Sequence, residues 1–232
     1  MNRSAIGSLV FSMLALMTAV AMLAAPYLIV AKAPLAYELF INQKIFYYHV
    51  PAAWAMLLSV LVCGSASIGY LVGRADWWDD VAAAAGRLAV VFGLIVLTTG
   101  PIWAKAAWGV YWTWEARLTT MLVLWLTFVA YCFLRRHGDS RTERLAAGLA
   151  VFGMADAPLV YFAVSFWRTQ HPGNWVVPSL PSSMLVPFLV SMGAFSLLWA
   201  MLLATLVAVR SGERRLRRLA FRLGQPDPLE QS

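Results

Sequence analysis

Long runs of apolar residues, separated by short polar connections, make up most of the chain. Six runs have the roughly 20 residues that a helix needs to cross the 30 Å or so of membrane hydrocarbon. They lie at about 8–31, 51–73, 81–99, 118–134, 145–166 and 183–209. Because the runs are continuous and do not alternate with polar residues, they predict an all-α polytopic membrane protein and disfavour a transmembrane barrel.

The connections between these runs are too short to hold a soluble domain. We therefore expect residues 1–232 to form a single integral membrane domain. The first run is too long for a cleavable signal peptide and is followed by further spans. The segment 210–232 is basic, and we predict a surface helix there with a frayed end around 225–228.

Composition narrows the class of protein further. Apolar residues make up 61% of the chain and charged residues 12%, about half the charged fraction of a soluble domain. So few charges cannot cover the surface of one soluble domain of this size. An ordinary soluble enzyme, a disordered chain and a disulfide-stapled secreted module are all excluded.

The distribution of basic residues predicts the orientation. Thirteen of the 18 lie on the side shared by both termini and the even-numbered connections. The other side holds Lys32, Lys44, Lys105, Arg117 and Arg168. The positive-inside rule then places both termini in the cytoplasm. The net charge of +7 reflects this orientation and some attraction to anionic membrane lipid, and gives no support for nucleic-acid binding.

Tryptophan is concentrated in the second outward connection, at 100–117, between the third and fourth spans. Four of the eleven tryptophans lie in these eighteen positions: Trp103, Trp108, Trp112 and Trp114. An aromatic belt at the membrane interface accounts for one or two of them. Four in one outward connection favour an aromatic platform for a planar hydrophobic ligand.

The platform has a definite geometry if residues 108–117 are helical. Trp108, Tyr111, Trp112 and Glu115 would then share one face by their spacing, whereas Trp114 would point elsewhere.

Two histidines flank this segment on the outward side. His49 stands where the second span begins, and His171 follows the fifth span. A lone interfacial histidine is usually a polar anchor, but paired neutral imidazoles are suitable axial ligands for haem iron. His137 lies in a charged inner connection, where we expect a solvated side chain without a role in binding.

Three ionisable residues leave alternatives open. Glu115 and Arg117 either neutralise each other, or Arg117 binds a carboxylate of the ligand. Asp156 lies well inside the fifth predicted span, where an acid costs roughly 2.5–3.5 kcal/mol to insert. It is either a functional group or a protonated or hydrogen-bonded residue beside Pro158.

Motifs for enzymatic chemistry are missing from the sequence. Cys63 and Cys132 lie inside separate spans, and no Cys-x-x-Cys motif exists for thiol redox chemistry or covalent haem attachment. No glycine-rich phosphate loop and no Gly-x-Ser-x-Gly motif occur either. We therefore expect a protein that is not an enzyme.

The tryptophan segment also carries a family resemblance. Residues 108–120 read Trp-Gly-Val-Tyr-Trp-Thr-Trp-Glu-Ala-Arg-Leu-Thr-Thr. They resemble the Trp-rich "WWD" signature of the haem-handling proteins of cytochrome c maturation, in particular the haem exporter protein C (CcmC) branch. Tyr48–Trp54 and the Trp167-x-x-x-His171 stretch also match. The similarity extends from about Lys44 to Gly173.

The resemblance implies a function and a set of site residues. Members bind haem b transiently at the outer face, with two axial histidines and a tryptophan platform. They act with the ATPase and membrane subunits of an ABC transporter and a small single-span subunit, and deliver haem to a periplasmic haem chaperone. The matching positions here are His49, His171, Trp108, Trp112, Trp114, Glu115 and Arg117.

Some positions depart from the family pattern. Tyr111 replaces a tryptophan and Glu115 replaces an aspartate, which are mild changes. Asp156 and Tyr161 differ from the residues expected in the fifth span, so the resemblance assigns nothing there.

We therefore expect a haem-transferring membrane subunit. Two alternatives are a membrane cytochrome b that retains its haem and a haem-free transporter subunit whose aromatic residues form only a belt.

Overall fold

The computed structural model describes residues 3–35, 39–137, 140–167, 169–173 and 176–223. Within these residues the chain is helical, and six helices are long and apolar enough to cross a membrane, as the apolar runs predict. They are α1 Arg3–Ala31, α2 Phe46–Gly73, α3 Asp76–Trp108, α4 Ala116–His137, α5 Ser140–Phe166 and α6 Ser182–Arg222. A short 3₁₀ helix, η1 at Ile41–Ile45, leads into α2.

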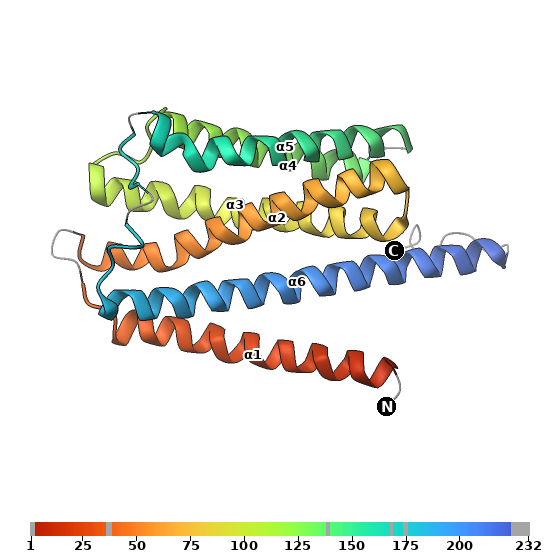
Figure 1. The fold of residues 1–232 in the computed structure, drawn as a ribbon, viewed down its shortest axis with the longest axis horizontal. Helices are drawn as coiled ribbons and strands as arrows, with labels where there is room; N and C mark the ends of the chain where they lie inside the picture. The colour runs from red at the N-terminus through yellow and green to blue at the C-terminus, as the bar shows by residue number, and fades with distance from the viewer. Residues whose placement is uncertain (1–2, 36–38, 138–139, 168, 174–175, 224–232) are drawn as a thin grey trace.

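The six helices run side by side along the long axis of the molecule (Figure 1). Helices α2 to α5 form one group, and α6 lies between this group and α1. His49 lies at the end of the molecule where α2 begins and α3 ends, and we call this end the histidine end. The opposite end, with the turns from α2 to α3 and from α4 to α5, is called the arginine end.

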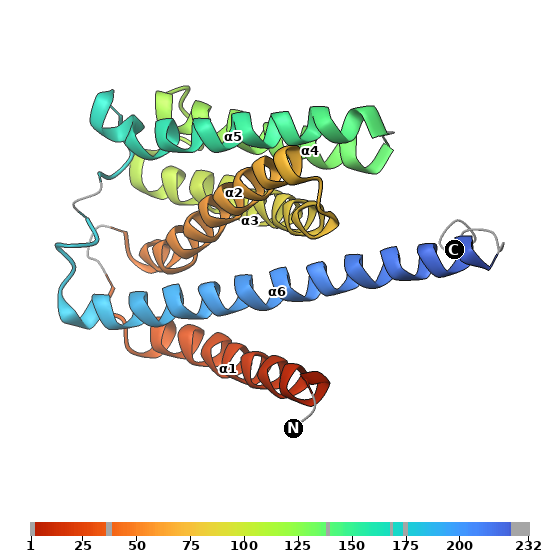
Figure 2. The same ribbon diagram turned by 45° about the vertical axis from the view of Figure 1, so that its right-hand side comes forward.

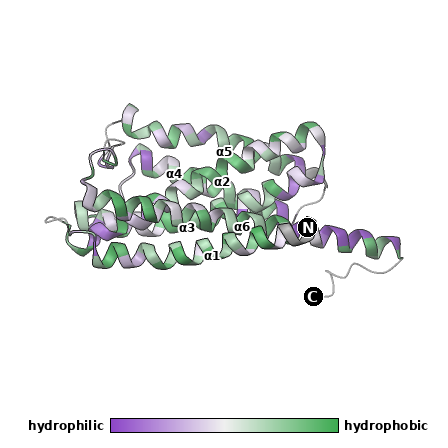
Figure 3. Cartoon of the chain, turned by 60° about the horizontal axis from the view of Figure 1, so that its bottom comes forward, coloured by the Kyte–Doolittle hydropathy of each residue, from purple (hydrophilic) through white to green (hydrophobic). Residues whose placement is uncertain are grey.

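Each predicted apolar run falls inside one helix, but two helices extend well beyond their runs. Helix α3 continues past Thr99 through Pro101 to Trp108. Helix α6 continues without a break from the apolar run through Arg210 to Arg222 (Figure 2), and its last turns combine hydrophilic and apolar residues (Figure 3). The basic segment is thus helical as expected up to this point, whereas the predicted frayed end at 225–228, like Arg168, lies outside the described residues.

Small residues on α3 allow aromatic side chains of α4 to approach its backbone. A Cβ atom placed on Gly86 would lie 2.3 Å from Cε1 of Tyr131, and one on Gly93 would lie 2.4 Å from Cδ1 of Trp125. The indole Nε1 of Trp125 also donates a hydrogen bond to the Val90 carbonyl at 3.0 Å. Close packing of this kind is what holds helices together in lipid.

Polar contacts fix the first turn of α2 against its neighbours. Lys44 Nζ donates to the carbonyls of Ile29 and Val30 at 2.7 and 2.8 Å, so it caps the end of α1. Ser191 Oγ of α6 donates to the carbonyl of the buried Tyr47. The start of α2, and with it His49, is therefore held by both α1 and α6.

Candidate functional site

The predicted site residues come from four different parts of the chain that meet at the histidine end. His49 lies in the first turn of α2, and Arg117 is the second residue of α4. His171 lies in the connection from α5 to α6. Arg117 and His49 both lie close enough to His171 for a positive charge on either to oppose protonation of its imidazole. The fold thus brings together residues that are more than 120 positions apart in sequence.

A hydrogen bond to α3 defines the tautomer of His49. The hydroxyl of Thr99 donates its hydrogen to the Ile95 carbonyl at 2.7 Å. Its oxygen is therefore an acceptor for His49 Nδ1, which lies 2.9 Å away and must carry the proton. The other ring nitrogen, Nε2, keeps its lone pair. Sequence reasoning missed Thr99, although a Thr-Thr-Gly-Pro stretch that interrupts an apolar run is a visible signal.

Gly100 gives the His49 ring its place against α3. A Cβ atom on Gly100 would lie 3.2 Å from Cε1 of the imidazole, closer than an ordinary van der Waals contact. The ring therefore packs directly over the α3 backbone, one residue before the proline inside this helix. A larger residue here would push the imidazole away from Thr99.

His171 shows the same tautomer as His49. Its Nδ1 lies 2.8 Å from the carbonyl of Pro172, and since a carbonyl only accepts, Nδ1 carries the proton and Nε2 keeps a lone pair. Burial, with a smaller contribution from the positive charge of Arg117, lowers the pKa of His171 to about 3. The ring is therefore neutral at physiological pH, which is the form that ligates metal ions.

Residues 109–115 are not helical, so the condition for one shared face of Trp108, Tyr111, Trp112 and Glu115 is not met. Helix α3 ends at Trp108 because Gly109 takes the left-handed conformation, with φ 77°. Its N–H bonds to the Lys105 carbonyl, and Lys105 Nζ donates to the Gly109 carbonyl at 2.7 Å. Glycine directly after a helix is a common stop signal and was available in the sequence.

The four tryptophans form two edge-to-face pairs. Trp103 packs against Trp108 with ring centroids 5.3 Å apart, and Trp112 packs against Trp114 at 5.7 Å. Trp114 is 77% exposed, whereas Trp112 is half-buried with an indole N–H that has no hydrogen-bond partner among the described residues. The segment thus combines an exposed aromatic ring with a shielded, unused donor.

Glu115 connects the Trp-rich segment to the loop that carries His171. Its Oε2 accepts a hydrogen bond from the backbone N–H of Gln170 at 2.7 Å. Its Oε1 is buried and, within the described part of the chain, has no partner. Glu115 therefore contacts the residue next to His171, a role that sequence reasoning did not assign to it.

Arg117 holds the end of α5 in place. Its Nη1 donates to the carbonyls of Val160 and Tyr161 at 3.0 and 3.2 Å. These carbonyls lie six and five residues before the last residue of α5, so Arg117 connects the start of α4 to the last two turns of α5. No direct ion pair joins Arg117 to Glu115 among the described residues, although the carboxylate lies near enough to act on the charge of the guanidinium.

The two remaining polar candidates differ in position. Asp156 is only partly buried in α5, and its Oδ2 lacks a hydrogen-bond partner among the residues described. His137 is exposed at the arginine end, and its Nδ1 lies 3.2 Å from the Phe133 carbonyl one turn earlier. Its position away from the other two histidines agrees with the absence of a predicted role.

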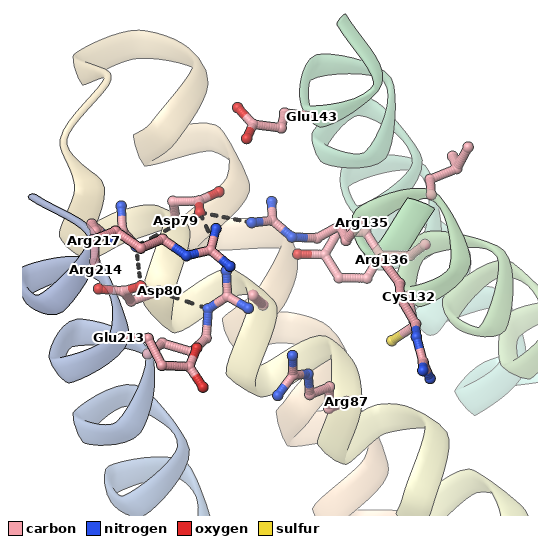
Figure 4. Close-up of a pocket in the computed structure, with 14 residues that line it drawn as sticks. Asp79, Asp80, Arg87, Cys132, Arg135, Arg136, Glu143, Glu213, Arg214 and Arg217 are labelled. Atoms are coloured by element: carbon pink, nitrogen blue, oxygen red, sulfur yellow. Dashed lines mark hydrogen bonds and ion pairs between the residues drawn. The ribbon is translucent and has the colours of Figure 1, made fainter. Parts of the chain in front are cut away.

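A second polar cluster, not predicted from the sequence, lies at the arginine end (Figure 4). The buried Asp79 and Asp80 near the start of α3 face arginines of α4 and α6. Arg135 Nη2 lies 2.7 Å from Asp79 Oδ2, and Arg214 pairs with Asp80. Arg210 lies between 3.6 and 3.8 Å from both carboxylates. These ion pairs explain why α6 remains helical beyond its apolar run.

Fold and site together define a class: a multi-pass helical membrane protein with two half-buried imidazoles and a tryptophan-rich segment at one end. A family model for heme exporter protein C (CcmC) matches residues 3–222. The chain therefore belongs to the heme exporter protein C family, which confirms the resemblance carried by residues 108–120.

Individual relatives agree with this assignment. Heme exporter protein C of Bradyrhizobium diazoefficiens is 38% identical over 197 residues, which is 82% of this chain and 74% of the relative. The protein of the same name from Escherichia coli K12 is 35% identical over 183 residues, 77% of this chain and 74% of its own length. A putative cytochrome c biosynthesis ccmC-like mitochondrial protein of Marchantia polymorpha is 30% identical over 176 residues, covering 73% of this chain and 74% of the relative.

Proposed function

We propose that this protein binds haem b at its histidine end, on the periplasmic side of the bacterial inner membrane, and passes it on during cytochrome c maturation. His49 and His171 are the axial ligands of the iron. Both termini and the arginine end then lie in the cytoplasm. The observation that carries the proposal is that both imidazoles donate from Nδ1 and so leave Nε2 unprotonated.

The donor set fits haem. Metal-binding histidines usually donate their second N–H to a carbonyl or another acceptor, which fixes the ring and its tautomer. Here the carbonyl of Pro172 and the hydroxyl of Thr99 are those acceptors. No group of three or more His, Cys, Asp or Glu side chains suited to a metal ion exists among the described residues. Two imidazoles alone hold a metal poorly, whereas haem brings four ring nitrogens and needs only two axial ligands.

The surroundings of the histidines support a planar, anionic ligand. Trp108, Trp112 and Trp114 supply aromatic surface for the macrocycle, and haem bound there would supply an iron centre with two axial positions for imidazole. The buried N–H of Trp112 and the charge of Arg117 match polar groups at the rim of such a ligand. Arg117 keeps its contacts with the end of α5 and acts through its charge.

Location favours transfer over permanent retention. The two histidines lie at a helix end and in a connecting loop, and the neighbouring Trp114 is largely exposed. A periplasmic haem chaperone can reach haem bound at such an edge without opening the helix bundle. We propose that the ABC-transporter ATPase and membrane subunits, with a small single-span subunit, form the complex in which release takes place. The chain itself would then bind and present haem without acting as an enzyme.

Absorption spectroscopy of the purified protein with added haem tests this function. Wild type should develop the Soret band of a six-coordinate haem, and H49A and H171A should each retain less haem through washing. H137A is the matched control, because it removes an exposed imidazole at the other end of the molecule. Equal loss from all three variants, or no Soret band from wild type with added haem, would overturn the proposal.

A further inference from the structure

A cavity of about 890 Å³ lies at the arginine end, where α3, α4 and the last turns of α6 meet (Figure 4). Six arginines and four carboxylates line this arginine cavity. Asp79 and Asp80 are already shared among Arg135, Arg210 and Arg214. Arginines therefore outnumber carboxylates in the cavity, and Asp79 and Asp80 are already paired with arginines.

Two of the arginines form no ion pair with a carboxylate in the described structure. Neither Arg87 of α3 nor Arg136 of α4 forms an ion pair there, although both line the cavity and are exposed. Of the other lining acids, Glu143 accepts a hydrogen bond from Tyr70 at 2.9 Å. The charges of Arg87 and Arg210 also repel each other. An anion in the cavity would relieve this repulsion.

The position of Arg87 along α3 favours an external counter-ion. Arg87 follows the first residue of α3 by eleven positions, which is roughly 16 Å along the helix at 1.5 Å per residue. It therefore lies within the candidate membrane span, where an unpaired charge is costly. In a bilayer crossed by the apolar run 81–99, Arg87 would lie near the end of the span, where lipid headgroups meet hydrocarbon.

Below the two arginines, the same helix faces become apolar. Val91 and Leu94 follow Arg87 at four and seven positions and are 51% and 50% exposed. Phe133 precedes Arg136 by three positions and is 62% exposed. Each guanidinium thus stands above an exposed apolar strip that runs toward the middle of the membrane. A phospholipid has this arrangement, with a charged headgroup above acyl chains.

We propose that the arginine cavity binds the phosphate of an anionic phospholipid of the cytoplasmic leaflet, held by Arg87 and Arg136. A planar guanidinium matches two phosphate oxygens, and basic pockets between membrane helices on the cytoplasmic side bind anionic headgroups. The proposal depends on the orientation given above but not on haem binding. A lipid bound here would connect α3 to α4 beside the ion pairs that anchor α6.

Native mass spectrometry of the detergent-purified protein, titrated with phosphatidylglycerol or phosphatidylcholine of the same acyl chains, tests this site. Wild type should bind phosphatidylglycerol more tightly than phosphatidylcholine. R87Q and R136Q should each weaken phosphatidylglycerol binding about fivefold, which corresponds to about 1 kcal/mol for each arginine. The doubly substituted R215Q/R222Q protein is the matched control for the R87Q/R136Q protein. It removes the same charge from the same end, at exposed arginines that do not line the cavity.

Inorganic phosphate as a competitor distinguishes a lipid from a soluble anion. The proposal predicts that phosphate leaves the bound phosphatidylglycerol in place. Displacement at millimolar phosphate, or equal phosphatidylglycerol affinity of the wild-type and R87Q/R136Q proteins, would overturn it. If the R87Q/R136Q protein does not fold, R87K serves instead: it keeps the charge, loses the two-pronged contact and should still weaken binding.

Discussion

Replacing Thr99 with valine removes the hydroxyl that accepts the proton of His49 Nδ1 while leaving the shape of the side chain almost unchanged. In wild type, Thr99 is itself oriented by donating to the Ile95 carbonyl, so its oxygen is a fixed acceptor. Without it, the His49 ring either keeps an unpartnered N–H or moves its proton to Nε2. Both outcomes oppose iron binding through Nε2.

The size of the effect follows from the role of a second-sphere hydrogen bond. Loss of such a partner typically weakens metal binding about 10-fold to 100-fold, or about 1.4 to 2.7 kcal/mol. We therefore expect T99V to raise the dissociation constant for haem at least about 10-fold. Titration of the protein with haem, followed at the Soret band, measures it.

Two matched variants make the Thr99 test specific. T99S keeps the hydroxyl and should bind haem nearly as wild type does. T98V removes a neighbouring hydroxyl that donates only to the Leu94 and Ile95 carbonyls within α3, and should also leave haem binding unchanged. If T99V binds haem as tightly as T98V, the assigned tautomer and the role of Thr99 are both wrong.

The remaining predictions concern the same end of the molecule. G100A places a methyl group 3.2 Å from the His49 ring and should weaken haem binding severalfold, as titration would show; unchanged affinity would mean that the ring has room to move. E115A should release the backbone N–H of Gln170 and lower haem retention about fivefold, by about 1 kcal/mol, whereas E115Q keeps an acceptor oxygen and should retain haem; equal behaviour of both would exclude this contact. The pKa of His171 is lowered by burial to about 3, so the folded protein favours the neutral ring. The stability that the neutral His171 ring contributes is complete above about pH 6.5 and is lost as the pH falls from about 6.5 toward 3. The melting temperature of the haem-free wild-type protein should therefore fall over this pH range more steeply than that of H171A.

The helices could be predicted from the sequence because hydrocarbon imposes length and polarity on each span. All six apolar runs lie inside helices, yet no run revealed that α6 continues to Arg222. That extension depends on ion pairs with Asp76, Asp79 and Asp80, which are more than 130 residues away in sequence. The spacing of Arg210, Arg214 and Arg218 by four residues marked one helix face, but apolar patterning could not identify its partner.

The candidate site was predictable as a set of residues but not as a set of contacts. His49, His171 and Arg117 were found from residue type and sidedness. The conformation of the Trp-rich segment was left open by the spacing of its aromatic residues, which fits a helical face only if the helix continues past Gly109, and α3 ends there. The Thr-Thr-Gly-Pro stretch marks Thr99 as unusual in an apolar run, but its pairing with His49, 50 residues away, depends on where α3 lies in three dimensions. The Pro172 carbonyl adjoins His171 in sequence, and its hydrogen bond depends on the conformation of the loop.

The central claim is that His49 and His171 together ligate one haem iron. Low-temperature electron paramagnetic resonance of the ferric haem complex tests it most directly, because two imidazole ligands give a low-spin signal distinct from that of one. Wild type should show the low-spin spectrum of bis-imidazole haem, and H49A and H171A should each convert to high-spin or mixed spectra that added imidazole returns to low spin. A bis-imidazole spectrum that persists unchanged in either single variant would contradict the account.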